Sequence, residues 1–214
     1  MLTRTRAFRT LMILAVVAVG GLTLTAAANP ARPGAPEDRW LKNLDGKYGQ
    51  FFDATAAGGG IPLIHILNYY DTYNSAYGVA DKDIDAVLSF YGMITFYAVN
   101  DAMWAKYNLG EFLDVKDAAG AGVTANPWRA NPTIVGMQMP QASIEALQKR
   151  GATFIVCNNA LTIFSNMLAQ KRGLDGDAVY ADLKANILPG VELVPGMVVA
   201  VEQAQDAGLA YHRQ

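Results

Sequence analysis

The sequence contains few of the side chains that bind metals or form disulfides. Its 214 residues include a single cysteine, Cys157, and two histidines, His65 and His212. One cysteine cannot form a disulfide within the chain, so the fold must be stabilised by packing alone. There is also no second thiol to resolve an oxidised sulfur, so any sulfur chemistry at Cys157 needs an outside partner. The three side chains show no local pairing, and we therefore expect no metal site and no cofactor.

Charged side chains are also scarce, and their signs nearly balance. They make up 17% of the chain, and the formal net charge is −2. Such a composition does not favour nucleic acid or an anionic membrane surface, so we expect neither as a partner. Apolar residues account for 52% of the chain, which excludes a disordered chain and suffices for one core. We therefore expect one globular domain.

Two common catalytic motifs are missing. Gly58–Gly60 lacks the Gly-Lys-Ser/Thr sequence that follows in a phosphate-binding loop, so we expect this segment to be a flexible hinge. No serine lies in a Gly-x-Ser-x-Gly turn, which argues against the hydrolases that depend on one. The carboxylates Asp53, Asp71 and Asp101 show no pairing that the sequence can reveal.

The first 28 residues have the three parts of a secretory signal peptide. A basic start is followed by the apolar run LMILAVVAVGGLTLT and then by three alanines, and residues 29–36 continue as a Pro/Ala/Gly-rich linker. We predict a cleaved signal peptide over 1–28, a linker over 29–36 and a single domain over 37–214. The mature protein would then be periplasmic or secreted. Loss of three arginines and no acid would change the net charge from −2 to −5.

A retained membrane anchor is the alternative for this segment. Residues 11–28 just reach the length that spans a bilayer, although they are rich in Ala, Gly and Thr. In that case the N-terminal segment would be the chain's contact with the membrane.

Short apolar segments alternate with segments of helical periodicity through the rest of the chain. The predicted strands are 61–67, 85–91, 134–139, 152–157, 191–194 and 209–213. The predicted helices cover 71–77, 95–107, 140–150, 158–172, 177–186 and 197–207. This alternation is typical of an α/β fold, and we predict a mostly parallel sheet of about five strands flanked by helices. In such sheets the functional groups collect at the carboxyl ends of the strands.

Cys157 lies where one predicted strand ends and a helix begins. Its sulfur would there face unsatisfied backbone N–H groups and the positive end of the helix dipole, which favour the nucleophilic thiolate. Asn158 or Asn159 would cap the same helical turn. The alternative is that TFIVC is an ordinary core strand, because free cysteine is among the most buried residue types. The sequence leaves both interpretations open.

Three further residues are candidates for a binding site. His65, within the predicted strand 61–67, is either a base that meets Cys157 across the sheet or an ordinary hydrogen-bonded strand residue. Asn68 and Tyr91 both end predicted strands and are candidates to line a ligand pocket. They lie in an aromatic-rich region that otherwise forms core or subunit interface.

The longest irregular segment, 114–133, contains Asn126, Trp128 and Arg129. A segment of this length without regular structure is usually functional or an interaction arm. These three residues are candidates for a lid or a partner-binding patch. We favour the alternative, in which the arm wraps a neighbouring subunit.

The C-terminal third of the sequence resembles a known family. The segments GATFIVCNNAL (151–161), KRGL (171–174) and ILPGVELVPGMVVAVEQAQDAGLAYHRQ (187–214) are similar to the DsrE/DsrF-like sulfur-relay family. The resemblance implies a compact α/β fold that assembles as a homotrimer or homohexamer. It also implies that Cys157 carries a persulfide sulfur and that its partner is an external thiol or sulfur donor. Arg172, in the matched motif, becomes a candidate binding residue.

Two hypotheses about function follow. The first is an exported DsrE-like protein that accepts or passes sulfur as a persulfide on Cys157. The second is an oligomeric protein without catalytic activity that binds a small ligand, with Cys157 as a structural residue. The export signal, the long helix over 162–172 and the 114–133 arm all depart from the pattern of the cytoplasmic relay members, so the sequence does not decide whether the chain is an enzyme.

Overall fold

A computed structural model describes residues 36–214 of the chain. The predicted signal peptide and residues 29–35 of the predicted linker lie outside the described residues, and both stay predictions. None of the helices within 36–214 combines the length and the apolar composition needed to cross a bilayer.

Within the described residues the core of the fold is a five-stranded parallel sheet. Its strands are β1 (Tyr48–Asp53), β2 (Ile84–Phe90), β5 (Thr153–Cys157), β6 (Val191–Val194) and β7 (Ala210–Arg213). They lie in the order β6-β5-β2-β1-β7, and every neighbouring pair is parallel. The central strand β2 is buried along its whole length, as expected for a parallel strand covered on both faces. The predicted α/β class and parallel sheet are confirmed.

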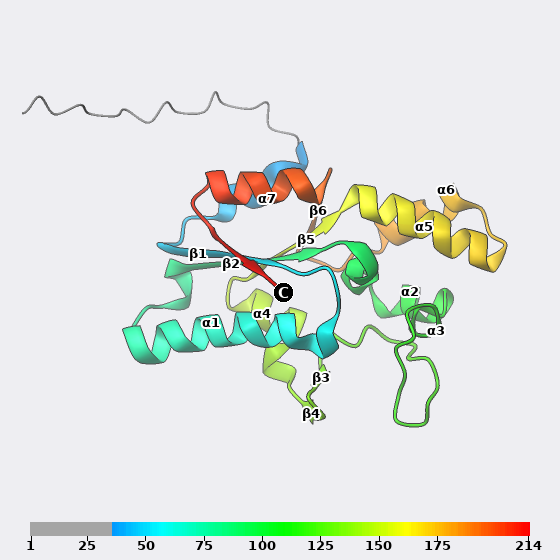
Figure 1. Ribbon diagram of the computed structural model, residues 1–214, viewed down its shortest axis with the longest axis horizontal. Helices are drawn as coiled ribbons and strands as arrows, with labels where there is room; N and C mark the ends of the chain where they lie inside the picture. The colour runs from blue at the N-terminus through cyan, green and yellow to red at the C-terminus, as the bar shows by residue number, and fades with distance from the viewer. Residues whose placement is uncertain (1–35) are drawn as a thin grey trace, which may run out of the picture. The chain divides into compact units, whose positions relative to one another are not determined.

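Helices cover both faces of this sheet. The α-helices are α1 (Ile61–Tyr77), α2 (Asp101–Lys106), α3 (Leu109–Phe112), α4 (Ile144–Lys149), α5 (Asn158–Arg172), α6 (Gly176–Ala185) and α7 (Met197–Asp206). The 3₁₀ helices are η1 (Pro36–Asn43), η2 (Gly58–Gly60), η3 (Asp81–Asp83), η4 (Gly92–Ala98) and η5 (Pro140–Ala142). Figure 1 shows α1 and α4 on one face, with α7 and η1 on the other.

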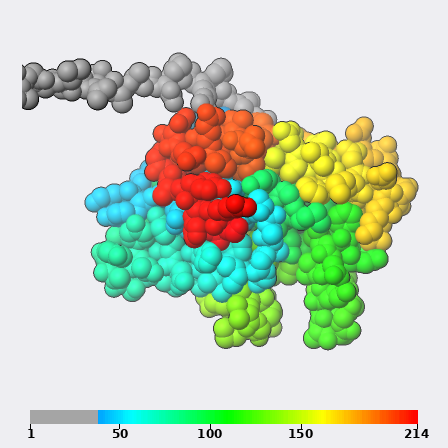
Figure 2. Space-filling view, viewed as in Figure 1, coloured from blue at the N-terminus to red at the C-terminus, as the bar shows by residue number. Residues whose placement is uncertain are grey.

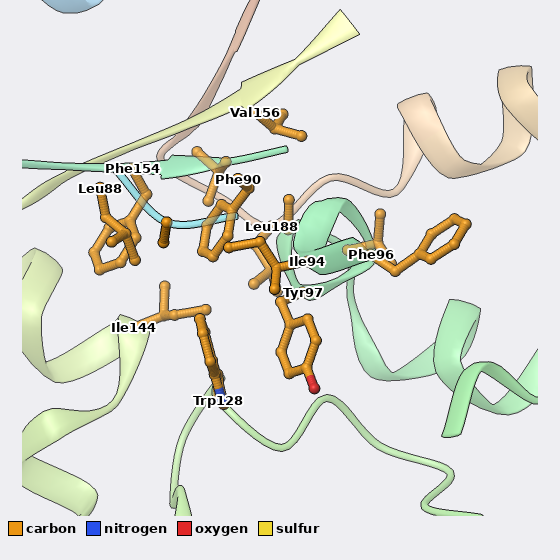
Figure 3. Packing of buried hydrophobic residues seen from close by; sticks show 14 of the residues in the cluster. Leu88, Phe90, Ile94, Phe96, Tyr97, Trp128, Ile144, Phe154, Val156 and Leu188 are labelled. Atoms are coloured by element: carbon orange, nitrogen blue, oxygen red, sulfur yellow. The ribbon is translucent and has the colours of Figure 1, made fainter. Parts of the chain in front are cut away.

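Alternate residues of each strand therefore enter two different cores. Phe52, Leu88 and Phe154 belong to the larger core on the α1 side, whereas the residues before or after them, Phe51, Val87 and Ile155, belong to the smaller core beneath α7. Close-packed aromatic and aliphatic side chains fill the larger core (Figure 3). Their labelled members come from β2, η4, the arm that precedes α4, α4 itself, β5 and the loop before β6.

The predicted strand over 61–67 is wrong, because these residues form the first turns of α1. Pro62 occupies a first-turn position, where its missing N–H needs no partner. Besides Pro62, the buried residues are Leu63, Ile66, Leu67 and Tyr70, which follow the helical spacing i, i+3, i+4, i+7. A short apolar run fits both periods, which explains the error. The actual first strand is β1, in a segment for which the sequence predicted no element.

The predicted strand over 134–139 is also wrong. The chain forms a small antiparallel hairpin there, with β3 (Thr133–Ile134) paired to β4 (Met137–Gln138) outside the main sheet. Val135 and Gly136 form its turn with φ angles of +51° and +75°. A two-residue turn with both φ angles positive is the geometry that a tight hairpin requires. The remaining predicted strands are confirmed to within two residues at each end.

The second half of the arm over 114–133, from Asn126 on, packs onto its own domain, whereas residues 116–121 are exposed. Trp128 is buried, with its ring centroid 4.4 Å from that of Tyr97 and 6.2 Å from that of Phe90. Arg129 forms ion pairs with Asp101 and Glu145. The expectation that Asn126 and Trp128 present an exposed lid or patch is wrong, because both side chains are buried. That the arm wraps a neighbouring subunit stays a prediction.

Asn126 fastens this arm through backbone groups. Its Nδ2 donates hydrogen bonds to the carbonyl oxygens of Tyr97 and Val99 at 2.7 and 2.8 Å, and its Oδ1 accepts one from Trp128 N–H at 2.9 Å. The side chain thus pairs three backbone groups that would otherwise be buried without a partner.

We predict that Asn126→Ala lowers the free energy of unfolding by about 2–4 kcal/mol, because each orphaned buried group costs about 1–3 kcal/mol. Denaturant unfolding of the two proteins measures the difference. Asn131→Ala is a matched control, since Asn131 also precedes a proline in the same arm but is exposed. Its effect should stay within about 0.5 kcal/mol. Equal effects of the two substitutions would contradict this account of the arm.

Candidate functional site

Polar side chains from four strands gather at the carboxyl edge of the sheet, on the face that α7 covers. Asp53 ends β1, Ser89 lies near the end of β2, Cys157 ends β5, and Tyr211 lies in β7. Asp53, Ser89 and Cys157 each lie two positions after a residue of the smaller core beneath α7, so they point to the same face as that residue. Tyr211 points there too, because it pairs in register with Phe51 of that core. Tyr91, directly after β2, packs against the same core. We call these five residues the carboxyl-edge cluster.

The sulfur of Cys157 lies at the start of two helices. Cys157 is the N-cap of α5, and its Sγ accepts a hydrogen bond from Ala160 N–H at 3.4 Å. It accepts a second from Met197 N–H, the first residue of α7, at 3.3 Å. The two helices meet there because Cys157 pairs in register with Val194, the last residue of the neighbouring strand β6. Two sets of unsatisfied N–H groups and two helix dipoles therefore point at one sulfur.

Cys157 is at the same time a packed residue. Its side chain is 5% exposed and belongs to the smaller core together with Ile155, Val194 and Met197. The two interpretations that the sequence left open are thus combined in one position. The sulfur is covered by apolar neighbours, and its polar contacts are backbone N–H groups at helix starts.

A buried carboxylate forms the other half of the cluster. Asp53 is 6% exposed, and its Oδ2 accepts hydrogen bonds from the hydroxyls of Tyr211 at 2.6 Å and Tyr91 at 3.2 Å. Its Oδ1 accepts one from the Ser89 hydroxyl at 3.2 Å. Ser89 in turn accepts a hydrogen bond from Ala54 N–H at 3.0 Å. Three hydroxyl groups therefore replace the water that a buried carboxylate loses.

This environment keeps both tyrosines protonated. Burial, together with the negative charge of Asp53 and the hydrogen bond to it, raises the pKa of Tyr91 to about 12. The hydrogen bond to Asp53 is the main cause that raises the pKa of Tyr211. At neutral pH both phenols are therefore donors to Asp53 and not bases.

Cys157 and Tyr91 are neighbours at the ends of the adjacent strands β5 and β2. The last paired residues of β2 and β5 are Phe90 and Val156, so Tyr91 and Cys157 are the next positions along the same register. Adjacent parallel strands lie about 4.8 Å apart, which places the two residues side by side at the sheet edge. Of the predicted binding residues, Tyr91 is the one that the fold brings to Cys157 from another strand.

The asparagines after Cys157 have different surroundings. Asn158 Oδ1 accepts a hydrogen bond from the Tyr180 hydroxyl at 2.6 Å, which fastens α5 to α6. Asn159 is exposed, and its amide lies against Gly196 at the start of α7. The N-cap of the helix is Cys157 itself, so the prediction that an asparagine side chain caps this turn is wrong.

Arg172 lies at the far end of α5. A helix rises about 1.5 Å per residue, so 15 residues separate Arg172 from Cys157 by about 20 Å. Its guanidinium contacts Glu111 Oε2 at 3.0 Å and the Asn108 carbonyl at 3.4 Å. The fold therefore does not bring it to the sulfur, and its contacts fasten α5 to α3.

His65 and Asn68 lie on the opposite face of the sheet from Cys157. Both belong to α1, which packs on the larger core, whereas Cys157 points into the smaller core beneath α7. The proposal that His65 acts as a base towards Cys157 is therefore wrong. The error follows from the segment 61–67, which is a helix and not a strand.

Sequence reasoning missed Asp53, Ser89 and Tyr211 as site residues. Asp53 was noted without a partner because β1 was not recognised, and the end of a parallel strand was the signal that would have selected it. Within 36–214 there is no group of three or more His, Cys, Asp or Glu side chains that could hold a metal ion.

Comparisons with known proteins show no family for this chain. Neither a protein family nor a curated protein matches this sequence. Among solved structures, the chain is similar to the "Protein of Unknown Function MTH1491 from Methanobacterium thermoautotrophicum", with 18% sequence identity and a TM-score of 0.37. The match covers 79% of this chain and 100% of that chain. A likeness of this degree says nothing about what the present chain binds or does.

We predict that the contacts of Tyr91 contribute stability that is lost in alkali. Its pKa is raised from about 10 to about 12 in the folded protein, so the protonated form is the one that folding favours. The contribution is complete below about pH 10 and is lost as the pH rises through about 12. Tyr91→Phe should lower the free energy of unfolding by about 0.5–1.5 kcal/mol at about pH 8, because a hydrogen bond is lost. It should also make the free energy of unfolding fall less steeply between about pH 10 and 12.

Tyr97→Phe is the control for this prediction, because burial alone raises the pKa of Tyr97 to about 12. The free energy of unfolding of both variants should decline less at alkaline pH than that of the wild type. At about pH 8 the Tyr91→Phe protein should in addition be less stable, because it lacks the hydrogen bond to Asp53. Urea unfolding at a series of pH values measures both effects. If the Tyr91→Phe protein is as stable as the wild type at about pH 8, the hydrogen bond from Tyr91 to Asp53 does not stabilise the fold, and the prediction is wrong.

Proposed function

We propose that the protein accepts sulfane sulfur on Cys157 and passes it on as a DsrE-like persulfide carrier. One observation carries the proposal: the backbone N–H groups of Ala160 and Met197, at the starts of α5 and α7, both donate to Cys157 Sγ. A thiolate and a persulfide anion are the forms that sulfur transfer uses, and the two donors at the helix N-termini are placed to hydrogen-bond to either.

The reaction consists of two sulfur transfers. The Cys157 thiolate attacks a sulfane sulfur of an inorganic polysulfide, a new S–S bond forms, and the shortened polysulfide leaves with the electron pair of the broken S–S bond. The product is a cysteine persulfide anion. An external thiolate then attacks the outer sulfur, takes it as its own persulfide, and releases the Cys157 thiolate. No other oxidant is needed, and the lone cysteine needs no second thiol in the chain.

The burial of Cys157 limits which donors can react. At 5% exposure its sulfur is closed to bulky reagents, so the donor must be small or must approach through a local opening at the start of α7. Burial also protects a bound persulfide from unrelated thiols. The carrier role therefore demands a small inorganic donor and a specific acceptor.

The carrier proposal retains two predictions from the sequence, export across a membrane and assembly as a homotrimer or homohexamer. Export would place Cys157 in an oxidising compartment, apart from the cytoplasmic relay partners.

A second candidate function treats Cys157 as structural. The burial of its side chain among Ile155, Val194 and Met197 favours this alternative, because inert cysteines are typically packed in this way. The protein would then act through binding alone. The two candidates differ in what the folded protein does with a small sulfur donor.

We predict that the folded protein gains the mass of one sulfur atom when treated with polysulfide. Intact-mass analysis after removal of excess reagent detects this change, and a dithiol should reverse it. Cys157→Ser is the matched control, since it keeps the size and the hydrogen-bond acceptor but has no thiol. It should gain no mass.

Unfolded protein provides the second control, because urea exposes the thiol fully. If Cys157 is a carrier, the folded protein should react with polysulfide at least as fast as the unfolded protein, while a bulky maleimide labels only the unfolded one. A folded protein that gains no sulfur, alongside an unfolded protein that does, would overturn the carrier proposal in favour of a structural cysteine.

A further inference from the structure

The two histidines of the chain come together from opposite ends of the fold. His65 belongs to α1 and His212 to β7, and their rings stack with centroids 5.4 Å apart and planes inclined by 21°. Figure 1 shows the end of β7 in front of α1, and Figure 2 shows the C-terminal residues against the surface of the chain around β1 and the start of α1. The pair lies on the α1 face, away from Cys157.

A hollow of about 280 Å³ opens beside this pair. It lies between α1 and the strands β1 and β7, the last of which is an edge strand of the sheet. The floor and walls are aromatic. Phe52 lies 5.5 Å from His212 and 5.6 Å from Tyr69, and Tyr69 lies 5.0 Å from Tyr73, each between ring centroids.

Apart from the two histidines, the polar groups of the hollow are amides and hydroxyls. Gln50, Asn68 and Thr72 supply amides and a hydroxyl, and no Asp, Glu, Lys or Arg is among the residues that line it. Burial, and next the neighbouring Tyr73, raise the pKa of Tyr69, so its phenol stays protonated. A charged ligand would find no ion pair to replace its lost hydration.

His65 has a fixed orientation at the rim. Its Nδ1 lies 2.5 Å from Oε1 of Gln214, and since an amide oxygen only accepts, Nδ1 carries the proton and donates. In the neutral ring Nε2 is then left as an acceptor. The ring is held in place before any ligand arrives, which lowers the entropic cost of binding.

We propose that this hollow is a binding site for a small, uncharged, planar aromatic molecule of one or two rings with a hydrogen-bonding substituent. Its stacked imidazoles and three further aromatic rings favour a flat partner. Its volume is just below the range of about 300–1,000 Å³ that drug-sized ligands occupy, so the ligand is smaller than these. The site is independent of the function proposed for Cys157.

The experiment uses the two histidines as reporters. Full-length protein labelled with ¹³C-histidine gives ring signals from His65 and His212, both of which line the hollow. Phenol is the probe, cyclohexanol is its non-planar match of similar size, and benzoate is its anionic match. Phenol should shift both signals saturably and bind at least about tenfold tighter than either comparison, a difference of about 1.4 kcal/mol.

Two variants locate the effect. Asn68→Trp should fill the hollow and abolish the phenol shift, whereas Ala76→Trp, on an exposed position of the same helix outside the hollow, should leave it unchanged. Cys157→Ala should also keep the shift. No saturable shift with phenol, equal binding of cyclohexanol or benzoate, or a shift that survives in Asn68→Trp would overturn the proposal.

Discussion

The common direction of the five strands is the constraint on which the candidate site depends. In a parallel sheet every strand ends at the same edge, so residues that are far apart in the sequence meet there whenever they end a strand. Asp53, Tyr91 and Cys157 are separated by dozens of residues and share this edge. The helices that follow the strands begin at the same edge, and their free N–H groups come with them.

Cys157 shows how this edge can give a buried sulfur hydrogen-bond donors. Packing alone would give an inert sulfur, and exposure alone would give an unprotected one. Here β5 carries the sulfur into the smaller core, while the starts of α5 and α7 direct two N–H groups at it. The second donor arises because α7 begins three residues after Val194, the register partner of Cys157. Burial and hydrogen bonding are therefore two results of one topology.

Much of the fold could be predicted from the sequence, but less of the site. Strands over 85–91, 152–157 and 191–194 were recognisable because each is short, apolar and bounded by turn residues. The segment 61–67 was misassigned because its five isoleucine and leucine residues fit both the strand and the helix period. The deciding information, burial of Leu63, Ile66 and Leu67, is tertiary. β1 was missed because Tyr48 to Gln50 are only half-buried and give no clear alternation.

The residues missed at the site share one physical cause. Asp53 became a candidate only when β1 was known to end there, and Tyr211 only when β7 was known to pair with β1. The histidine pair has the same origin, since no spacing in the sequence connects position 65 with 212. The sequence could indicate which residues end strands, but the order of the strands decides which of these ends are neighbours.

The edge strand β7 determines both candidate sites at once. Successive side chains of a strand point to opposite faces, so Tyr211 reaches Asp53 on the α7 side while His212 stacks on His65 on the α1 side. A slip of one residue in the pairing of β7 with β1 would exchange the two faces and remove both sets of contacts. Two hydrogen bonds to Asp53 hold this register: one from the Tyr211 hydroxyl to its carboxylate, and one from Gln214 N–H to its backbone carbonyl at 2.9 Å. This strand of four residues thus contributes His212 to the aromatic hollow and Tyr211 to the carboxyl-edge cluster, because its register determines which side chain points to which face.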